Sequence, residues 1–276
     1  MSFDPHSLLD RFEGERFAFE LRGWKGPPGL FWAASPERAE ILAERQAWLR
    51  QNPERHRVYL PSAQDLVDET CLLAGALDPT YRPPQNVSLD DKLLALGGHG
   101  EADFILCRQS QGGRMRMEAA VVCFPSHWTP ETRLGLEVEE IHAPVPGLNG
   151  ALAPKINNLL ERLPASQAWL RVNWGLSSCS DRNQHPLRHR PRLGRETPME
   201  QIWLRVEHQA LVRLPQTQGI LFGIRLHCFG LESLQARPAV ARAIGGQLRN
   251  MPAEMQAYKG IQDVAGRVAG WLEQAS

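Results

Sequence analysis

Apolar and polar residues alternate most regularly between residues 201 and 214. One phase of this alternation is apolar except for His208, and the other phase carries Arg205, Glu207 and Gln209. Because successive side chains of a strand point to opposite faces, the pattern predicts a strand with one buried face. His208 therefore interrupts an apolar face, while the charged residues Arg205 and Glu207 are neighbours on the opposite face.

Similar apolar runs predict four further strands. They cover residues 103–108, 115–124, 168–174 and 219–228. The turn Ser110-Gln111-Gly112-Gly113 separates the first two, and Pro215-Gln216-Thr217-Gln218 separates the strand at 201–214 from the last one. Short loops of this kind are typical of antiparallel neighbours. We therefore expect an antiparallel sheet of about five strands.

Helical patterns lie before, within and after this run of strands. Ser35-Pro36-Glu37 and Ser62-Ala63-Gln64-Asp65 resemble helix-capping sequences, residues 152–163 have helical spacing, and a helical pattern returns from Leu231 to the end. The predicted fold class is α+β, an antiparallel β-sheet flanked by N- and C-terminal helices. We expect an N-terminal helical region at 1–90, a sheet core at 91–229 and a C-terminal helical region at 230–276.

Composition narrows the range of partners. The chain has 276 residues, and its 31 basic and 31 acidic residues give a formal net charge of zero. No overall field would attract nucleic acid or an anionic membrane, so we expect neither as a partner. No apolar run approaches the roughly 20 residues of a membrane span, and the N-terminus lacks the pattern of a signal peptide. We therefore expect a cytoplasmic protein.

The five cysteines are an odd number and contain no C-x-x-C motif. This argues against a disulfide framework and against a zinc knuckle. The chain also lacks G-x-G-x-x-G and G-x-S-x-G, the motifs of dinucleotide binding and of a serine nucleophile. Its chemistry must therefore be sought in other motifs.

Several short motifs follow one another in the second half of the chain. They are Phe124-Pro125-Ser126-x-Trp128, Ile141-His142-x-Pro144-Val145-Pro146, Arg171-x-Asn173-Trp174, Arg205-Val206-Glu207-x-Gln209 and Phe222-x-Ile224-Arg225. In order and spacing the chain resembles the heme-dependent oxidative N-demethylase family, the PAS-like heme subunits related to dimethylamine monooxygenase. The resemblance spans roughly Asp91 to Phe229, and several motifs in register are more specific than any one of them.

The resemblance implies a PAS-like sheet that holds heme b, with the core at 91–229 as the heme-binding part. Dioxygen would be activated at the heme iron to oxidise an N-methyl group of a small amine, giving a demethylated amine and formaldehyde. Electrons would come from a separate reductase that uses NADPH, flavin and an iron–sulfur centre. The chain shows none of the motifs of such a reductase. The oligomeric state stays open.

His142 is the first candidate for the iron ligand, because an open heme site commonly uses a neutral imidazole. It lies in the family-like motif, where Pro144 and Pro146 stiffen the following backbone. The alternative is that His142 caps a loop by hydrogen bonding to a carbonyl group. His127 is the next candidate.

Glu207 and His208 are the candidate catalytic residues. A buried carboxylate favours a cation, so Glu207 could bind the ammonium group of an amine or relay protons, although an ion pair with Arg205 is the simpler role. At His208 the family pattern commonly has arginine. With the small residues Ala210 and Gly223, this departure suggests a roomier pocket and a different substrate, such as an amino or N-hydroxy compound.

Arg171, Arg205 and Arg225 are candidates to bind the heme propionates, because a guanidinium group matches a carboxylate in geometry. Trp128 and Trp174 offer flat apolar area for a porphyrin face. Solvation for some of the arginines and core packing for the tryptophans are the ordinary alternatives.

Two further hypotheses remain open. The chain could be a PAS-like sensor or binding protein that holds heme or a small molecule without turnover, since a fold alone does not decide function. The basic loop from Arg188 to Arg192 could contact an acidic electron donor, or it could simply be solvated.

Overall fold

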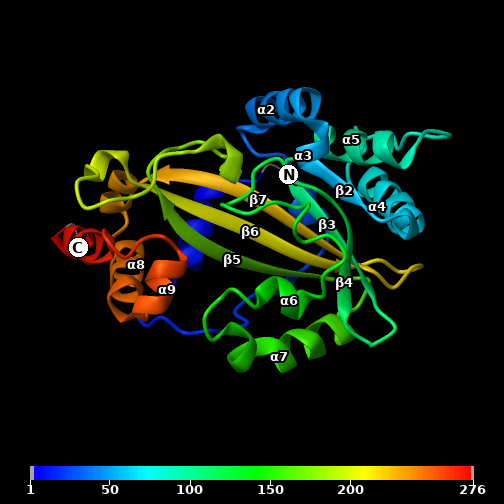
Figure 1. Ribbon diagram of the computed structural model, residues 1–276. Coiled ribbons are helices and arrows are strands. Elements are labelled where there is room, and N and C mark those ends of the chain that lie inside the picture. The colour runs from blue at the N-terminus through cyan, green and yellow to red at the C-terminus, as the bar shows by residue number, and fades with distance from the viewer. Residues whose placement is uncertain (1–2, 275–276) are drawn as a thin grey trace.

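In the computed structural model, which describes residues 3–274, one twisted sheet crosses the molecule (Figure 1). Its strands are β1 (Trp24–Gly26), β2 (Arg57–Tyr59), β3 (Asp103–Gln109), β4 (Met115–Val121), β5 (Ala168–Ser177), β6 (Trp203–Arg213) and β7 (Ile220–Gly230). The order is β1-β5-β6-β7-β3-β4-β2, and all neighbours are antiparallel. The predicted α+β fold is confirmed.

The sheet has seven strands rather than about five. The two unexpected strands, β1 and β2, are three residues long, which is too short for an alternating pattern to reveal them. Both come from the N-terminal region and pair at the two edges of the sheet, β1 with β5 and β2 with β4. The N-terminal region thus shares the sheet of the core, and the expected division into three regions stays a prediction.

Helices flank the sheet on both sides. They are α1 (Gly29–Trp32), α2 (Arg38–Gln51), α3 (Pro53–His56), α4 (Gln64–Leu77), α5 (Leu89–His99), α6 (Val138–His142), α7 (Leu148–Arg162), α8 (Pro238–Asn250), α9 (Ala253–Tyr258) and α10 (Ala265–Gln274). Helix α5 begins after Ser88, whose Oγ accepts a hydrogen bond from the backbone N–H of Asp91. None of the helices within residues 3–274 is both long and apolar enough to cross a bilayer.

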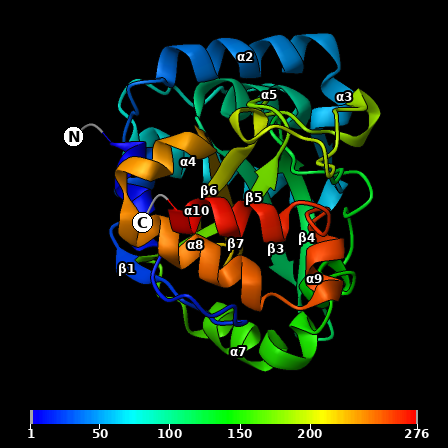
Figure 2. The ribbon, with the colours of Figure 1, turned by 90° about the vertical axis from the view of Figure 1, so that its left-hand side faces the viewer.

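One face of the sheet, here called the packed face, carries the alternate β6 residues Val206, His208 and Ala210. All three are buried. Residues of α2, α4 and α5 pack against one end of this face, and residues of α8 and α10 pack against the other end. Figure 2 shows α8 and α10 in front of the sheet and α2 above it. The packed face therefore contains most of the hydrophobic core.

The opposite face, here called the site face, carries Arg205, Glu207 and Gln209. Helices α6 and α7 are inserted between β4 and β5 and lie along this face (Figure 1). Leu160 of α7 belongs to the apolar cluster that covers one part of it, together with Met117 of β4. Strands β3 to β7 and this helical insertion lie within residues 91–229, the range given to the predicted core, except for Gly230 at the end of β7.

A buried carboxylate fixes the chain where it leaves β4 for the site face. Asp103 accepts hydrogen bonds from the backbone N–H groups of Cys123 and Phe124 at 2.7 and 3.1 Å. It also pairs with Arg45, whose side chain is fully buried, at 2.7 Å. These bonds hold the segment that continues directly into Ser126.

Candidate functional site

Glu207 lies in the middle of the site face and is held by three neutral donors. Its Oε1 accepts from Ser126 Oγ at 3.1 Å, and its Oε2 accepts from Asn173 Nδ2 at 3.1 Å and Gln209 Nε2 at 2.8 Å. Asn173 is the direct β5 neighbour of Glu207. Among residues 3–274, no basic group forms an ion pair with this carboxylate. Glu207 is therefore oriented and half-buried, without a direct ion-pair partner among the described residues, although the charges of Arg171 and Lys259 interact with it at a distance.

Arg205 does not form the expected ion pair with Glu207. Its guanidinium donates to the carbonyl oxygens of Asp181 and Arg182 at 2.7 and 2.9 Å, and to Ser126 Oγ at 3.2 Å. Arg205 therefore holds the loop after β5 and shares Ser126 with Glu207. Its hydrogen-bonding capacity is largely used for structure, which makes it a weak candidate for binding a propionate.

Arg171 is the β5 neighbour of Gln209 and also lies on the site face. Within residues 3–274 its guanidinium has no hydrogen-bond or ion-pair partner, and its Nε is buried. Burial lowers the pKa of Arg171, and the nearby charge of Glu207 opposes this shift. An unpartnered guanidinium in this position is suited to an anionic group of a ligand.

His142 ends the short helix α6. Its Nδ1 is buried without a partner, and no described residue hydrogen-bonds to either ring nitrogen. The loop-capping role considered from the sequence therefore does not occur. Burial lowers the pKa of His142, and the charge of Arg171 lowers it further, so the imidazole is neutral at neutral pH. This is the form that can bind a metal.

Half-buried apolar side chains continue the site face beyond Arg171. They are Trp128, Trp169, Leu211, Phe222 and Ile224. Trp169, Leu211 and Phe222 are direct neighbours across β5, β6 and β7. Partial exposure of large apolar side chains in the middle of a sheet leaves a surface that a flat apolar ligand can cover. Trp128 packs against this apolar cluster, and its contact with a porphyrin stays a prediction.

His208 points away from Glu207, into the packed face. Its ring is stacked on Phe3 and Trp24 at centroid distances of 5.2 and 6.0 Å, and Phe31 meets it edge-on at 5.5 Å. Burial lowers the pKa of His208 to about 3. The structure therefore does not bring Glu207 and His208 together.

The two small residues near His208 do not enlarge a pocket either. Ala210 is buried on the packed face. A Cβ atom at Gly223 would lie 2.3 Å from Phe31 Cε1. The space that the sequence suggested is therefore filled by Phe31.

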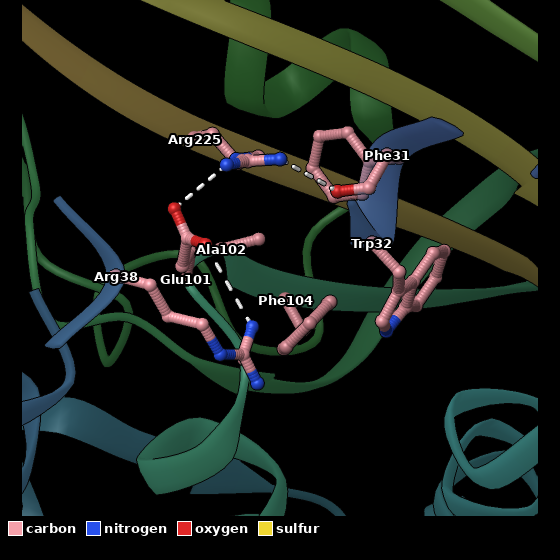
Figure 3. Close-up of a pocket in the computed structure, with 8 residues that line it drawn as sticks. Phe31, Trp32, Arg38, Glu101, Ala102, Phe104 and Arg225 are labelled. Carbon is pink, nitrogen blue, oxygen red and sulfur yellow. Dashed lines mark hydrogen bonds and ion pairs between the residues drawn. The ribbon is translucent and has the colours of Figure 1, made fainter. Parts of the chain in front are cut away.

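Arg225 also belongs to the packed face, and Figure 3 shows its contacts. It pairs with Glu101 at 2.6 Å and donates to the carbonyl oxygens of Phe31 and Ala33 at 3.1 and 2.7 Å. The cavity drawn there has a volume of about 10 Å³, room for one water molecule. Arg225 is therefore a structural residue and lies on the face opposite Arg171.

Trp174 lies on the packed face as well, where its Nε1 donates to Gln247 Oε1 at 3.1 Å. Its backbone carbonyl accepts a hydrogen bond from Lys259, which follows α9. Lys259 lies close enough to Glu207 for their charges to interact. The C-terminal region therefore contributes to the site.

Four residues of the candidate site were not singled out from the sequence: Ser126, Asn173, Gln209 and Lys259. The first three stand inside the family-like motifs, so their positions gave a usable signal. Lys259 stands outside those motifs, and no pattern in the sequence links it to β5. Within residues 3–274, no three His, Cys, Asp or Glu side chains gather to form a metal site.

The family model described as haem-dependent oxidative N-demethylase, alpha subunit-like matches residues 70–269. The chain belongs to this family. The match confirms the resemblance and extends beyond Asp91 to Phe229 at both ends, so it includes Lys259. Membership in the haem-dependent oxidative N-demethylase, alpha subunit-like family indicates an oxidative role that depends on heme.

The site face fits a heme group on three observations. His142 offers a neutral imidazole without a hydrogen-bond partner. Arg171 offers an unpartnered cation, and the row of half-buried apolar residues offers a surface for a porphyrin ring. A heme needs an axial ligand, a group for its propionates and an apolar wall.

Proposed function

We propose that the protein is a heme-dependent, oxygen-using oxidoreductase that demethylates a small N-methylated amine. The main support for the proposal is the hydrogen bonding of the Glu207 side chain. Three neutral donors fix its carboxylate, and no cation within residues 3–274 pairs with it. A positioned carboxylate without a direct ion-pair partner can accept a cationic ligand in contact, and an amine substrate is an ammonium ion at neutral pH.

In this proposal His142 is the iron ligand and Arg171 binds a heme propionate. Heme, when bound, would supply the iron at which dioxygen is activated. Glu207 would hold the ammonium group of the substrate and could accept its proton, because the amine must lose a proton before its nitrogen lone pair is free. Ser126, Asn173 and Gln209 would keep the carboxylate in place.

We propose no heme contacts for three of the residues suggested by the sequence: Arg205, Arg225 and Trp174. The first is bonded to loop carbonyls, and the other two lie on the packed face. His208 leaves the proposed catalytic pair for the same reason. The departure from the family pattern at His208 is therefore an adjustment of core packing and gives no support to a different substrate.

The test of heme ligation is the visible spectrum of protein expressed with a heme supply. Wild type is expected to show a Soret band, and His142→Ala is expected to lose or shift it. His127→Ala is the matched control, because His127 is exposed and has a left-handed backbone with φ of 62°. A band that survives in His142→Ala but vanishes in His127→Ala would assign the ligand to His127 instead.

The test of turnover is formaldehyde release from dimethylamine with a chemical reductant and dioxygen. Demethylation by wild type and its loss in Glu207→Gln would support the proposal. Reversible gas binding with no formaldehyde from any amine would favour the sensor alternative. If wild-type protein from fully heme-supplied cells shows no Soret band, both the heme-dependent enzyme and the heme sensor are excluded.

A separate reductase that uses NADPH, flavin and an iron–sulfur centre is part of the proposal, because the family description names an alpha subunit. The basic loop is a poorer docking surface than its sequence suggests. Arg188 and Arg190 both pair with Asp181, and Arg182 pairs with Glu37, Glu40 and Glu44. Unchanged reduction kinetics at low salt in a Arg190→Ala, Arg192→Ala variant would exclude this loop as the contact.

A further inference from the structure

Lys259 reaches the edge of the site face from the C-terminal region. It directly follows α9, and its Nζ donates to the backbone carbonyl of Trp174 at 2.8 Å. Strand β1 pairs with β5 only over Ala168 to Leu170, so the carbonyl of Trp174 lies on an edge that no strand covers there. One role of Lys259 is therefore to donate a hydrogen bond to a backbone carbonyl group at the uncovered edge of the sheet.

This hydrogen bond leaves the charge of Lys259 unbalanced. Among residues 3–274, no carboxylate forms an ion pair with it, and the nearest aromatic contact is the ring of Trp174 at 5.6 Å. Burial lowers the pKa of Lys259, Glu207 opposes this shift, and Arg171 adds to it. An ammonium group with one neutral acceptor has donors left for a further partner.

Arg171 and Lys259 are thus two unbalanced cations beside one carboxylate. Glu207 is already bound by three neutral donors, and it interacts with both cations only at a distance. Half-buried cations without a direct ion-pair partner favour a ligand that supplies negative charge. The surplus of positive charge lies at the β5 side of the site.

We propose that Lys259, together with Arg171, binds a carboxylate group of a ligand on the site face. This proposal rests on the proposed function and deepens it. The carboxylate has two sources with the same chemistry: a heme propionate, or the acid group of a substrate such as an N-methylated amino acid. In the second case, Glu207 would bind the ammonium end of a zwitterion and Lys259 its carboxylate end.

The propionate source is tested by titrating the apo protein with iron protoporphyrin IX and with its dimethyl ester, following the Soret band. If a propionate is the partner, wild type should bind the diacid about 10- to 100-fold more tightly than the ester. Lys259→Gln, which keeps a donor for Trp174 but loses the charge, should have a several-fold smaller preference, because only Arg171 then binds the carboxylate. Lys259→Arg should keep it.

The substrate source is tested on the heme-loaded protein by the spectral shift on titration with N-methylglycine and with N-methylglycinamide. The two compounds share the ammonium group, and only the first has a carboxylate. Wild type should prefer N-methylglycine, and this preference should be several-fold smaller in Lys259→Gln, which keeps only Arg171. Lys155→Gln, an exposed lysine of α7, is the matched control and should behave as wild type in both titrations.

Either reduction in preference supports the proposal and identifies the source. A Lys259→Gln protein that folds and matches wild type in both titrations overturns it and leaves Lys259 as a cap on the edge of β5. If wild type binds no heme, the proposed function fails separately. The carboxylate site is then decided by calorimetry of the apo protein with N-methylglycine and its amide, where equal heats for wild type and Lys259→Gln refute it.

Discussion

Arg225 and Arg171 lie on opposite faces of the same sheet. Their contacts predict that substitution by methionine reduces stability at Arg225 and reduces heme affinity at Arg171. Arg225→Met removes a partner of the buried Glu101, at 2.6 Å, and the donor of two backbone carbonyls. Both side chains of the ion pair are at most 3% exposed. Arg171→Met removes a guanidinium that has no partner among residues 3–274.

Breaking a buried ion pair from one side costs about 3–5 kcal/mol, because the remaining charge stays buried. Glu101 keeps its bonds from Ser35 and lies 3.7 Å from Arg38, so about 4 kcal/mol is the expected loss for Arg225→Met. With an unfolding entropy of about 2.1 cal/mol/K per residue, the 276 residues give about 0.58 kcal/mol/K. The melting temperature should therefore fall by about 7 °C.

Arg171→Met should change the free energy of unfolding by less than about 1 kcal/mol, because no hydrogen bond is lost and a half-buried charge without a partner in residues 3–274 is removed. Its affinity for heme should instead fall by about 10-fold or more. Urea titration measures the stability of both variants, and the Soret titration measures heme binding. An Arg225→Met protein of normal stability, or an Arg171→Met protein that loses several kcal/mol, would refute the division into a packed face and a site face.

Three further predictions follow from the same geometry. Glu207→Gln should weaken binding of dimethylammonium by about 10- to 100-fold in spectral titrations, with little change in stability, since Asn173 and Gln209 can still donate to the amide oxygen and the Ser126 hydroxyl can accept from the amide NH2; unchanged binding would exclude Glu207 from the amine site. Burial lowers the pKa of His208 to about 3. Between pH 6.5 and 3 the unfolded chain therefore binds a proton on this imidazole that the folded chain does not, and the free energy of unfolding decreases by about 1.4 kcal/mol for each pH unit of acidification. Urea midpoints at pH 7 and 4.5 should therefore differ less in His208→Leu than in wild type, and an equal difference would contradict the neutral, buried imidazole. Gly223→Ala should destabilise by about 1–3 kcal/mol in urea, because its Cβ would lie 2.3 Å from Phe31; the control Gly175→Ala, with open space around its Cβ, should not, and equal losses would show that crowding is not the cause.

The sequence by itself predicted the five long strands and showed which residues of a strand share one face of the sheet. Period-two alternation at 201–214 placed Glu207 and His208 on opposite faces, because neighbouring side chains of a strand cannot share one. The motifs around His142, Arg171 and Glu207 indicated the family, which the match over 70–269 confirms. Strands β1 and β2 escaped prediction, since three residues carry no period and their pairing is decided by distant partners.

Only the tertiary structure decided which charged side chains are paired and which have no partner among the described residues. The sequence around an arginine does not show whether its guanidinium forms an ion pair or has no partner. Arg225 meets Glu101, which lies 124 positions away, whereas Arg171 meets no partner in residues 3–274. The hydrogen bond of Lys259 to Trp174 spans 85 positions. Such contacts depend on how helices and strands pack together, and no local spacing encodes them.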